Sequence, residues 1–340
     1  MLPWRETTNP YYIWLSEVIL QQTRVVQGME YYHRFVSTYP TVEQLADADE
    51  DEVLRLWQGL GYYSRARNLH KAARMIVESR KSEVESQDSL FPATFDALRA
   101  LPGVGDYTAG AIASFAYDQP YPALDGNVYR VLARLFDCEI AFDTSAGKKH
   151  FHRLAEELLD RDQPRLFNSA IMEFGALYCL PLSPDCGGCP LQPFCRAYTS
   201  GTVELLPVRK PRPTLRDRYF SYTIYITPNR KTLIHQRTAK DIWQHLYEFP
   251  LVEHQTEEEW QAFCPERTDS KIQRFEDSKN ERYKNLSFTH ILSHQRLHAR
   301  FYVVAVNELP MLDDTLAVTW EALDDYALSR LTLKALEAIH

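Results

Sequence analysis

Residues 101–110 read LPGVGDYTAG, and this stretch decides the fold expected for the first part of the chain. Gly103 and Gly105 lie between two segments with helical apolar spacing, so we expect a tight turn between two helices. Such a turn exposes backbone N–H groups at the start of the second helix, an arrangement that binds phosphate. The pattern favours a helix-hairpin-helix motif with Gly103, Val104 and Gly105 at the phosphate. A plain interhelical turn stabilised by glycine is the alternative.

The remainder of the first 200 residues also shows helical spacing and no strand alternation. Residues 206–217 then shift to proline and basic residues, as expected of an extended linker. Residues 219–226 and 300–306 are rich in aromatic and β-branched residues, with helix-like acidic stretches between and after them, which indicates an α/β domain. The sequence therefore predicts three parts: a mainly α region over 1–205, a linker over 206–217 and an α/β domain over 218–340.

Composition bounds the class of protein. With 340 residues, 45% of them hydrophobic, the chain can bury a substantial core. It has no apolar run near the roughly 20 residues that span a bilayer, and its start has no secretory signal, so we expect a cytosolic protein with no membrane partner. The net charge of −8 gives no general attraction to phosphate. Any binding to DNA must then come from local basic groups, backbone amides and helix N-termini.

Four of the six cysteines lie within 17 residues, a crowding that favours metal ligation over disulfide bonding. These four are Cys179, Cys186, Cys189 and Cys195. Prolines and glycines interrupt the stretch, and such a loop can surround a tetrahedral set of thiolates. Zinc and a 4Fe-4S cluster both accept four thiolates, and the spacing alone does not separate them. Cys138 and Cys264 have no cysteine nearby and are expected to be packing residues.

Glu17 is an acidic residue in an apolar setting. Asn9 and Pro10 form a good cap and first-turn pair, so a helix should begin there. Three and four residues from Glu17 stand Ile13, Trp14, Leu20 and Gln21, none of them basic. A carboxyl in such a place tends to have a raised pKa and to stay protonated, as a general acid requires. A solvated glutamate on the outer helix face is the alternative.

Two further stretches leave their roles open. Asp125, in the sequence LDGNV over 124–128, directly precedes a helix with an apolar stripe, and its simplest role is that of an N-cap. Residues 59–71 join a glycine turn and two tyrosines to a basic helix face, a mixture that suits a phosphate backbone and an exposed base. A solvated helix face is the alternative for this second stretch.

Taken together, these motifs resemble one family, the adenine DNA glycosylases of the MutY type within the helix-hairpin-helix glycosylases. From Leu2 to about residue 200 the matching motifs follow in order: LPWR, LSExxLQQT, GLGYY, LPGVGxYTAG, LDGNV and the cysteine spacing. The resemblance implies an enzyme that hydrolyses the N-glycosidic bond of adenine mispaired with 8-oxoguanine or guanine in base excision repair. It also implies a monomer that binds double-stranded DNA in the cytoplasm, with the nucleoid if the source is bacterial.

The same resemblance assigns residues. The four cysteines should hold a 4Fe-4S cluster, Glu17 and Asp125 should be the catalytic carboxyls, and Tyr107 and Asn127 should orient Asp125. Tyr107 also stands where endonuclease III has a Schiff-base lysine, so base removal without an efficient strand-cleaving step is expected. The pocket for extruded adenine should include Trp4, Arg5 and Leu20, and contacts beside 8-oxoguanine should come from Gln22, Thr23, Leu60 and Tyr62. Ser169 occupies a position that is polar or acidic in some relatives, and its role stays open.

The last third resembles the Nudix-like domain of that family, where Ser293 and His294 should contact 8-oxoguanine. Leu292 replaces the phenylalanine usual before this pair. The acidic helix of a Nudix hydrolase is not recognisable after Pro250, so we expect a lesion-reading module instead of a second enzyme. The chain begins at LPWR, whereas relatives usually carry one more helix before it, so either the start is misassigned or that helix is dispensable.

Two other functions compete with this interpretation. A noncatalytic DNA-binding adapter with a structural zinc site would keep the cysteines and the hairpin, but it would not need both Glu17 and Asp125. A bifunctional thymine-glycol or uracil glycosylase is disfavoured by Tyr107 and by the additional C-terminal domain.

Overall fold

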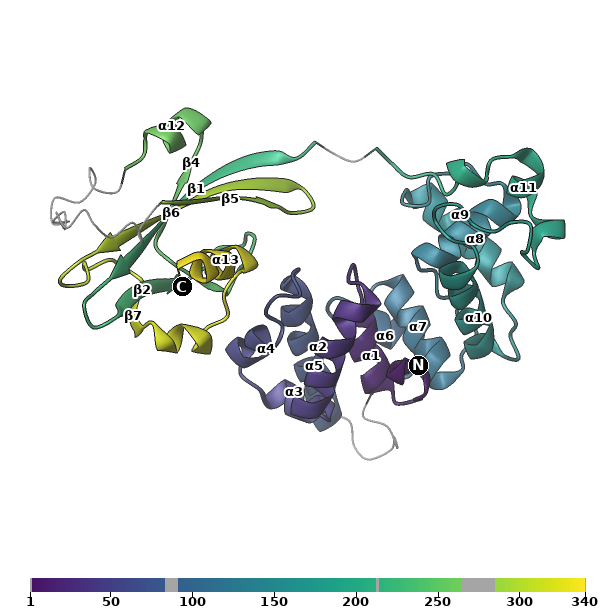
Figure 1. Ribbon diagram of the computed structural model, residues 1–340. Coiled ribbons are helices and arrows are strands. Elements are labelled where there is room, and N and C mark those ends of the chain that lie inside the picture. The colour runs from purple at the N-terminus through teal and green to yellow at the C-terminus, as the bar shows by residue number, and fades with distance from the viewer. Residues whose placement is uncertain (1, 83–90, 212–213, 265–284, 340) are drawn as a thin grey trace. The chain divides into compact units, whose positions relative to one another are not determined.

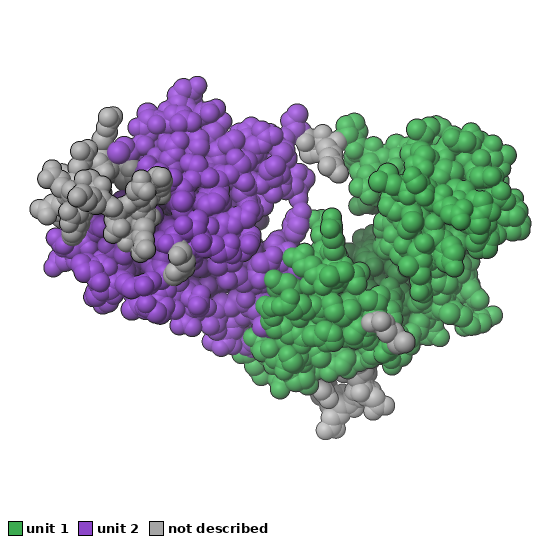
Figure 2. Space-filling model, in the orientation of Figure 1, with its two compact units in different colours: residues 1–47, 68–212 green, residues 48–67, 213–340 purple. Residues whose placement is uncertain are grey.

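The computed structural model describes four stretches of the chain: 2–82, 91–211, 214–264 and 285–339. They form two compact units, which Figure 2 shows in separate colours. Unit 1 comprises residues 1–47 and 68–212, and unit 2 comprises residues 48–67 and 213–340. Helix α5 (Ser64–Ser82) crosses the boundary between them. None of the helices in the described stretches is long and apolar enough to cross a membrane.

Unit 1 is helical throughout its described residues, as the sequence predicts. Besides the larger part of α5, its elements are η1 (Pro3–Arg5), α1 (Pro10–Ile19), α2 (Val25–Thr38), α3 (Val42–Asp47), α6 (Phe95–Arg99), α7 (Asp106–Tyr117), α8 (Gly126–Phe136), α9 (Ser145–Leu158), α10 (Pro164–Leu177), η2 (Gln192–Phe194), α11 (Arg196–Ser200) and η3 (Val203–Leu205). Helix α7 packs against α1, α6 and α10, while α8 packs against α9, α10 and α11 (Figure 1). Helices α7 and α10 therefore connect the two halves of the unit.

Helix α1 begins where its sequence indicates. Asn9 has extended backbone angles, and its side-chain oxygen accepts a hydrogen bond from the Tyr11 N–H at 2.9 Å. Pro10 occupies the first turn, where its missing N–H costs no hydrogen bond. Eight of the ten helix residues are buried, so α1 is a core helix of unit 1 and not an amphipathic surface helix.

The expected turn between two helices is present at residues 100–105. Helix α6 ends at Arg99 and α7 starts at Asp106, with Gly105 as its N-cap. Gly103 has a φ of +78°, and a Cβ added there would lie 2.9 Å from the Cβ of Asn68 on α5. A larger residue at position 103 would therefore meet both backbone strain and a clash, which explains the glycine.

The described residues of unit 2 form two sheets together with α-helices, in the expected α/β arrangement. Its elements are α4 (Glu50–Leu56), β1 (Arg216–Ile226), β2 (Lys231–Gln236), β3 (Tyr247–Glu248), β4 (Leu251–His254), α12 (Glu257–Ala262), β5 (Leu286–Ile291), β6 (Gln295–Ala305), β7 (Leu316–Thr319), η5 (Glu321–Asp325) and α13 (Arg330–Ile339). The larger sheet has the order β4-β1-β6-β5, with β1 and β6 parallel, and the smaller has the order β3-β2-β7. Alternate residues of β1 and β6, such as Phe220 and Phe301, form the core with Leu331 of α13.

Residues 48–67 precede most of unit 1 in sequence but pack against the C-terminal part of the chain. The Tyr63 hydroxyl donates to the Leu328 carbonyl at 3.2 Å, and the Gln58 side chain accepts from the Leu328 N–H at 2.9 Å. Arg67 donates to the Gln244 carbonyl at 2.7 Å. Arg67 is one of the basic residues of the 59–71 stretch, and its guanidinium thus binds a backbone carbonyl within unit 2.

The linker is only partly extended. The Phe142 N–H donates to the Val208 carbonyl at 3.2 Å, and the Lys210 N–H donates to Asp143 at 2.9 Å. These contacts hold the first linker residues on unit 1. Linker residues 212 and 213 lie outside the described residues, and β1 begins at Arg216.

Candidate functional site

Glu17, which is buried, and Tyr107, which is half-buried, form a hydrogen-bonded pair in unit 1. Glu17 projects from α1 and is 5% exposed, which rules out the solvated alternative. The Tyr107 hydroxyl, from the first turn of α7, donates to its carboxyl at 2.7 Å. Burial raises the pKa of Glu17 above its ordinary value, and the nearby Asp125 charge adds to the rise. Arg5 and the Tyr107 hydrogen bond act in the opposite direction without cancelling it, so the geometry favours a protonated carboxyl.

Arg5, on η1, is a cation near Glu17. The helical spacing around Glu17 did not predict it, because Arg5 lies outside α1. Its guanidinium stacks on the Phe115 ring at 4.1 Å, and Nη2 donates to the Met172 sulfur of α10 at 3.2 Å. Nη1 is buried and has no hydrogen-bond partner among the described residues. A guanidinium only donates, so this N–H is available to an acceptor atom of a bound molecule.

Asp125 is the N-cap of α8, and it lies close enough to Glu17 and Tyr107 for its charge to raise their pKa values. Its Oδ1 accepts from the backbone N–H groups of Asn127 and Val128, each at 2.8 Å. Its Oδ2 accepts from the Asn127 side-chain amide at 2.8 Å. Tyr107 differs from the expectation, because its hydroxyl bonds to Glu17 instead of Asp125. The Asp125 charge nevertheless contributes to the raised pKa of Tyr107.

The sequence motifs assign no role to two buried arginines of α8, Arg130 and Arg134. Arg130 donates to the Asn127 side-chain oxygen at 2.9 Å and to the carbonyls of Gly175 and Cys179, both at 2.6 Å. One turn further, Arg134 donates to the Leu180 carbonyl at 2.6 Å. Arg130 and Arg134 lie four residues apart on the helix that follows Asp125, and this spacing is the sequence pattern that could have identified them. Arg130 thus connects the Asp125 and Asn127 pair to the first cysteine of the loop.

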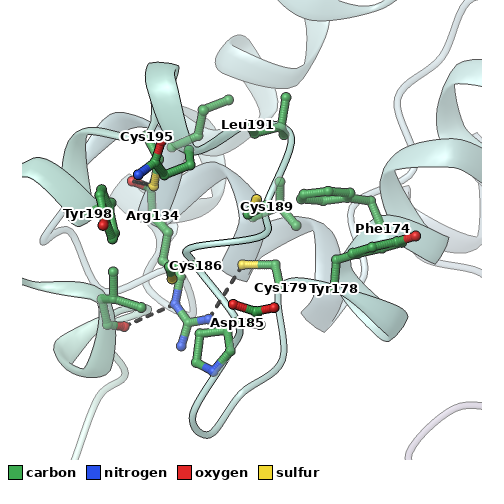
Figure 3. A pocket seen from close by; sticks show the side chains of 15 residues that line it. Arg134, Phe174, Tyr178, Cys179, Asp185, Cys186, Cys189, Leu191, Cys195 and Tyr198 are labelled. Atoms are coloured by element: carbon green, nitrogen blue, oxygen red, sulfur yellow. Dashed lines mark hydrogen bonds between the residues drawn. The ribbon is translucent and has the colours of Figure 1, made fainter.

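The four clustered cysteines line one pocket of unit 1, shown in Figure 3. Arg134 lines the same pocket, and its guanidinium donates to the Cys179 sulfur at 3.4 Å. Burial and the charges of the other three thiols raise the pKa of Cys186, so Cys186 lies within electrostatic range of the other three. No group of three metal-binding side chains is already in ligating arrangement within the described residues. Four thiols on one pocket fit the donor set of zinc or a 4Fe-4S cluster.

The other expected contact residues of unit 1 lie on η1, directly after α1 and on α10. Trp4 is 3% exposed and packs edge-on against Tyr32, with ring centres 5.0 Å apart. Leu20 caps the end of α1, and Gln22 follows with a φ of +56°, an uncommon conformation for a residue other than glycine. The Thr23 hydroxyl donates to the Gln21 carbonyl at 3.3 Å. Ser169 is half-buried on α10.

The expected contacts to 8-oxoguanine in unit 2 gather around a β-hairpin. Ser293 and His294 form the two-residue tip between β5 and β6, and both are exposed. The Tyr62 and Ser293 hydroxyls share a hydrogen bond of 2.5 Å, although the residues are 231 positions apart. Tyr62 is 49% exposed with a φ of +50°, whereas Leu60 is only 6% exposed. Of these two residues, only Tyr62 presents its side chain to solvent.

Comparison with known proteins matches both parts of the chain. Residues 15–160 match the HhH-GPD superfamily of base excision DNA repair proteins, and residues 221–338 match the NUDIX domain. Among solved structures, a thermostable thymine-DNA glycosylase is similar to this chain with a TM-score of 0.52 and 28% identity, over 59% of this chain and 89% of that protein.

Several curated relatives carry the description adenine DNA glycosylase. The protein of Buchnera aphidicola from Baizongia pistaciae is 30% identical, over 95% of this chain and 87% of its own length. The protein of Buchnera aphidicola from Acyrthosiphon pisum is 34% identical, over 75% of this chain and 71% of its own length. The rat protein is 44% identical, but the match spans 61% of this chain and 41% of the rat protein. The chain therefore belongs to the adenine DNA glycosylase family.

Proposed function

We propose that this chain hydrolyses the bond between adenine and deoxyribose in double-stranded DNA, where adenine is mispaired with 8-oxoguanine or guanine. The observation that carries the proposal is the cluster of buried Glu17 with half-buried Tyr107 and Asp125, in which the Glu17 carboxyl favours its protonated form. Family membership supports adenine as the base. Neither carboxyl could reach the glycosidic bond inside a stacked duplex, so the adenine must leave the helix before reaction.

The chemistry needs an acid and an anion. Glu17 would donate its proton to N7 of adenine, because an adenine anion is a poor leaving group. As the bond between adenine and C1′ breaks, Asp125 would stabilise the positive sugar or bond to it transiently. Water then attacks C1′, and the Glu17 carboxylate takes the proton of that water. For this retaining course the two carboxyl groups should lie about 5–6 Å apart in the complex with DNA.

Arg5 supplies a hydrogen-bond donor for the extruded base. Its partnerless Nη1 is buried near Glu17 and can only donate a hydrogen bond. An acceptor nitrogen of adenine would satisfy it, which would recover the cost of leaving a buried donor unpaired. Trp4 and Leu20 would provide the apolar walls of the same base pocket.

Recognition of the opposite base is assigned to unit 2. The exposed hydroxyl of Ser293 and the His294 side chain could hydrogen-bond the edge by which 8-oxoguanine differs from guanine. Tyr62 is exposed beside them and could stack on a base. Gln22 and Thr23 are proposed as contacts beside the same lesion. At the hairpin turn, Gly103, Val104 and Gly105 would bind a backbone phosphate.

The cysteine pocket is proposed to hold a 4Fe-4S cluster through Cys179, Cys186, Cys189 and Cys195. When bound, the cluster would join the loop by four iron–thiolate bonds. Arg134, which already donates to the Cys179 sulfur, would stabilise thiolate charge there. We further propose a monomer that works in the cytoplasm beside its DNA substrate.

A single-turnover assay tests the proposed function. Excess protein is mixed with duplexes that pair adenine with 8-oxoguanine, guanine or thymine, and each reaction is analysed with and without alkali. Strand breaks that need alkali and depend on 8-oxoguanine or guanine opposite adenine are expected, because the enzyme leaves an abasic site. Strand breaks without alkali would instead indicate the bifunctional chemistry of a lysine nucleophile. No adenine release from any duplex would refute the proposal.

A further inference from the structure

Asn168, on α10, lies at the centre of a buried hydrogen-bond cluster that includes none of the proposed catalytic residues. It is 1% exposed. Its side-chain oxygen accepts from the Ala123 N–H at 3.0 Å. Its amide nitrogen donates to the Tyr121 carbonyl and to the Ser114 hydroxyl of α7, both at 2.9 Å. The side chain therefore holds backbone groups on both sides of Pro122, two to four residues before Asp125.

Two glycines bring the neighbouring helices unusually close to the same segment. A Cβ added to Gly110 of α7 would lie 2.7 Å from the Pro122 carbonyl oxygen. A Cβ added to Gly175 of α10 would lie 2.7 Å from the Cβ of Asn127 and 3.0 Å from its carbonyl oxygen. The segment that carries Asp125 is thus packed against backbone on both α7 and α10.

We propose that Asn168 is a positioning residue, which fixes the backbone before Asp125 so that the carboxylate meets the sugar in the reactive geometry. This inference rests on the proposed function of Asp125. An amide is suited to the role because it donates and accepts at one place, as Tyr121 and Ala123 require. A hydroxyl is shorter, and a carboxylate would face the Tyr121 carbonyl with a negative charge.

The expected consequence is a loss of rate without a matching loss of DNA binding. A displacement of about 1 Å in a catalytic group costs on the order of 100-fold in rate. Removal of the Asn168 amide frees the two backbone contacts and allows a displacement of this size at Asp125. Asn168 is 1% exposed and has no surface to offer to DNA, so affinity for the mismatch should change little.

The test uses the full chain with Asn168→Ala and Asn168→Asp, and Ser114→Ala as a matched control. Ser114 is buried like Asn168 and belongs to the same cluster, but the loss of its hydroxyl leaves the bonds from Asn168 to Tyr121 and Ala123 in place. Three quantities are measured for each variant: the single-turnover rate of adenine release at saturating protein, the Kd for the mismatched duplex, and the midpoint of thermal unfolding.

We expect both Asn168 variants to lose on the order of 100-fold in rate with Kd within a few-fold of the parent. Ser114→Ala should lower the unfolding midpoint yet keep the parent rate. The inference is overturned if a folded Asn168 variant keeps its rate, if Ser114→Ala loses as much, or if only the Asn168 variants fail to fold. An inactive parent chain would refute the proposed function itself, which separates the two failures.

Discussion

Replacement of Glu17 by glutamine should inactivate the protein and, above the ordinary carboxyl pKa, stabilise its fold. Glutamine keeps the shape of the side chain and can still accept the Tyr107 hydrogen bond. It cannot donate a proton to adenine, so base release should fall about 10²- to 10⁴-fold, the usual contribution of a general acid. Binding to the mismatched duplex should persist, because the change adds no charge and little volume.

The stability effect follows from the raised pKa of Glu17, whose ordinary value is 4.5. Below pH 4.5 the carboxyl is protonated in both the folded and the unfolded chain, and the full stability is present. As the pH rises through 4.5 the unfolded chain ionises first, and stability is lost until the pH passes the folded pKa. Each unit by which burial raises the pKa contributes about 1.4 kcal/mol to this loss. Glu17→Gln removes the loss, because glutamine does not titrate.

Urea unfolding of the parent and of Glu17→Gln at several pH values measures this difference. The free energy of unfolding of the variant, relative to the parent, should increase between pH 4.5 and 8. An unpaired glutamine N–H could lower the variant by about 1–3 kcal/mol, but equally at every pH. Glu173→Gln, at an exposed position of α10, should show no such trend. A difference independent of pH, or one that decreases as the pH rises, would refute the assignment of Glu17 as a buried acid.

Three further predictions concern the other groups. Asp125→Asn should abolish base release and keep mismatch binding, and a near-normal single-turnover rate would contradict its role. The purified protein should be brown, with broad visible absorption and four irons per chain, and Cys186→Ser should lower the iron content; a colourless, fully active zinc protein would exclude the cluster. Ser293→Ala should weaken the preference for 8-oxoguanine over guanine opposite adenine by about 1–3 kcal/mol, whereas Thr289→Ala, on the exposed face of β5, should not.

The local features of the fold could be predicted because short-range chemistry determines them. Asn9 and Pro10 specify the start of α1 through a hydrogen bond and a missing donor that lie within three residues of each other. Gly103 specifies the turn before α7 through its positive φ. The aromatic and β-branched run at 219–226 specifies β1 through its residue types, and residues 220–225 are all buried, as in a strand covered on both faces.

Long-range pairings could not be predicted from such patterns. Arg5 stands twelve residues before Glu17, outside any helical spacing, and the two interact because η1 packs against α1. Tyr107 contacts Glu17 because α1 and α7 pack together, which no local pattern specifies. The packing of residues 48–67 on the C-terminal part, seen in the Tyr62 and Ser293 pair, joins segments more than 200 residues apart. Only the assembled cores determine these contacts.

The environments of Glu17 and Asp125 differ in a way that suits their proposed roles as acid and anion. Glu17 projects from the last turn of a buried helix, and the loss of water there favours its neutral form. Asp125 lies at the start of α8, where two backbone N–H groups and the Asn127 amide all donate to it. Donors at a helix N-terminus favour negative charge. Under the proposed roles, exchange of the two residues would place the acid among donors and the anion in an apolar setting, and each environment would then oppose the role of its carboxyl.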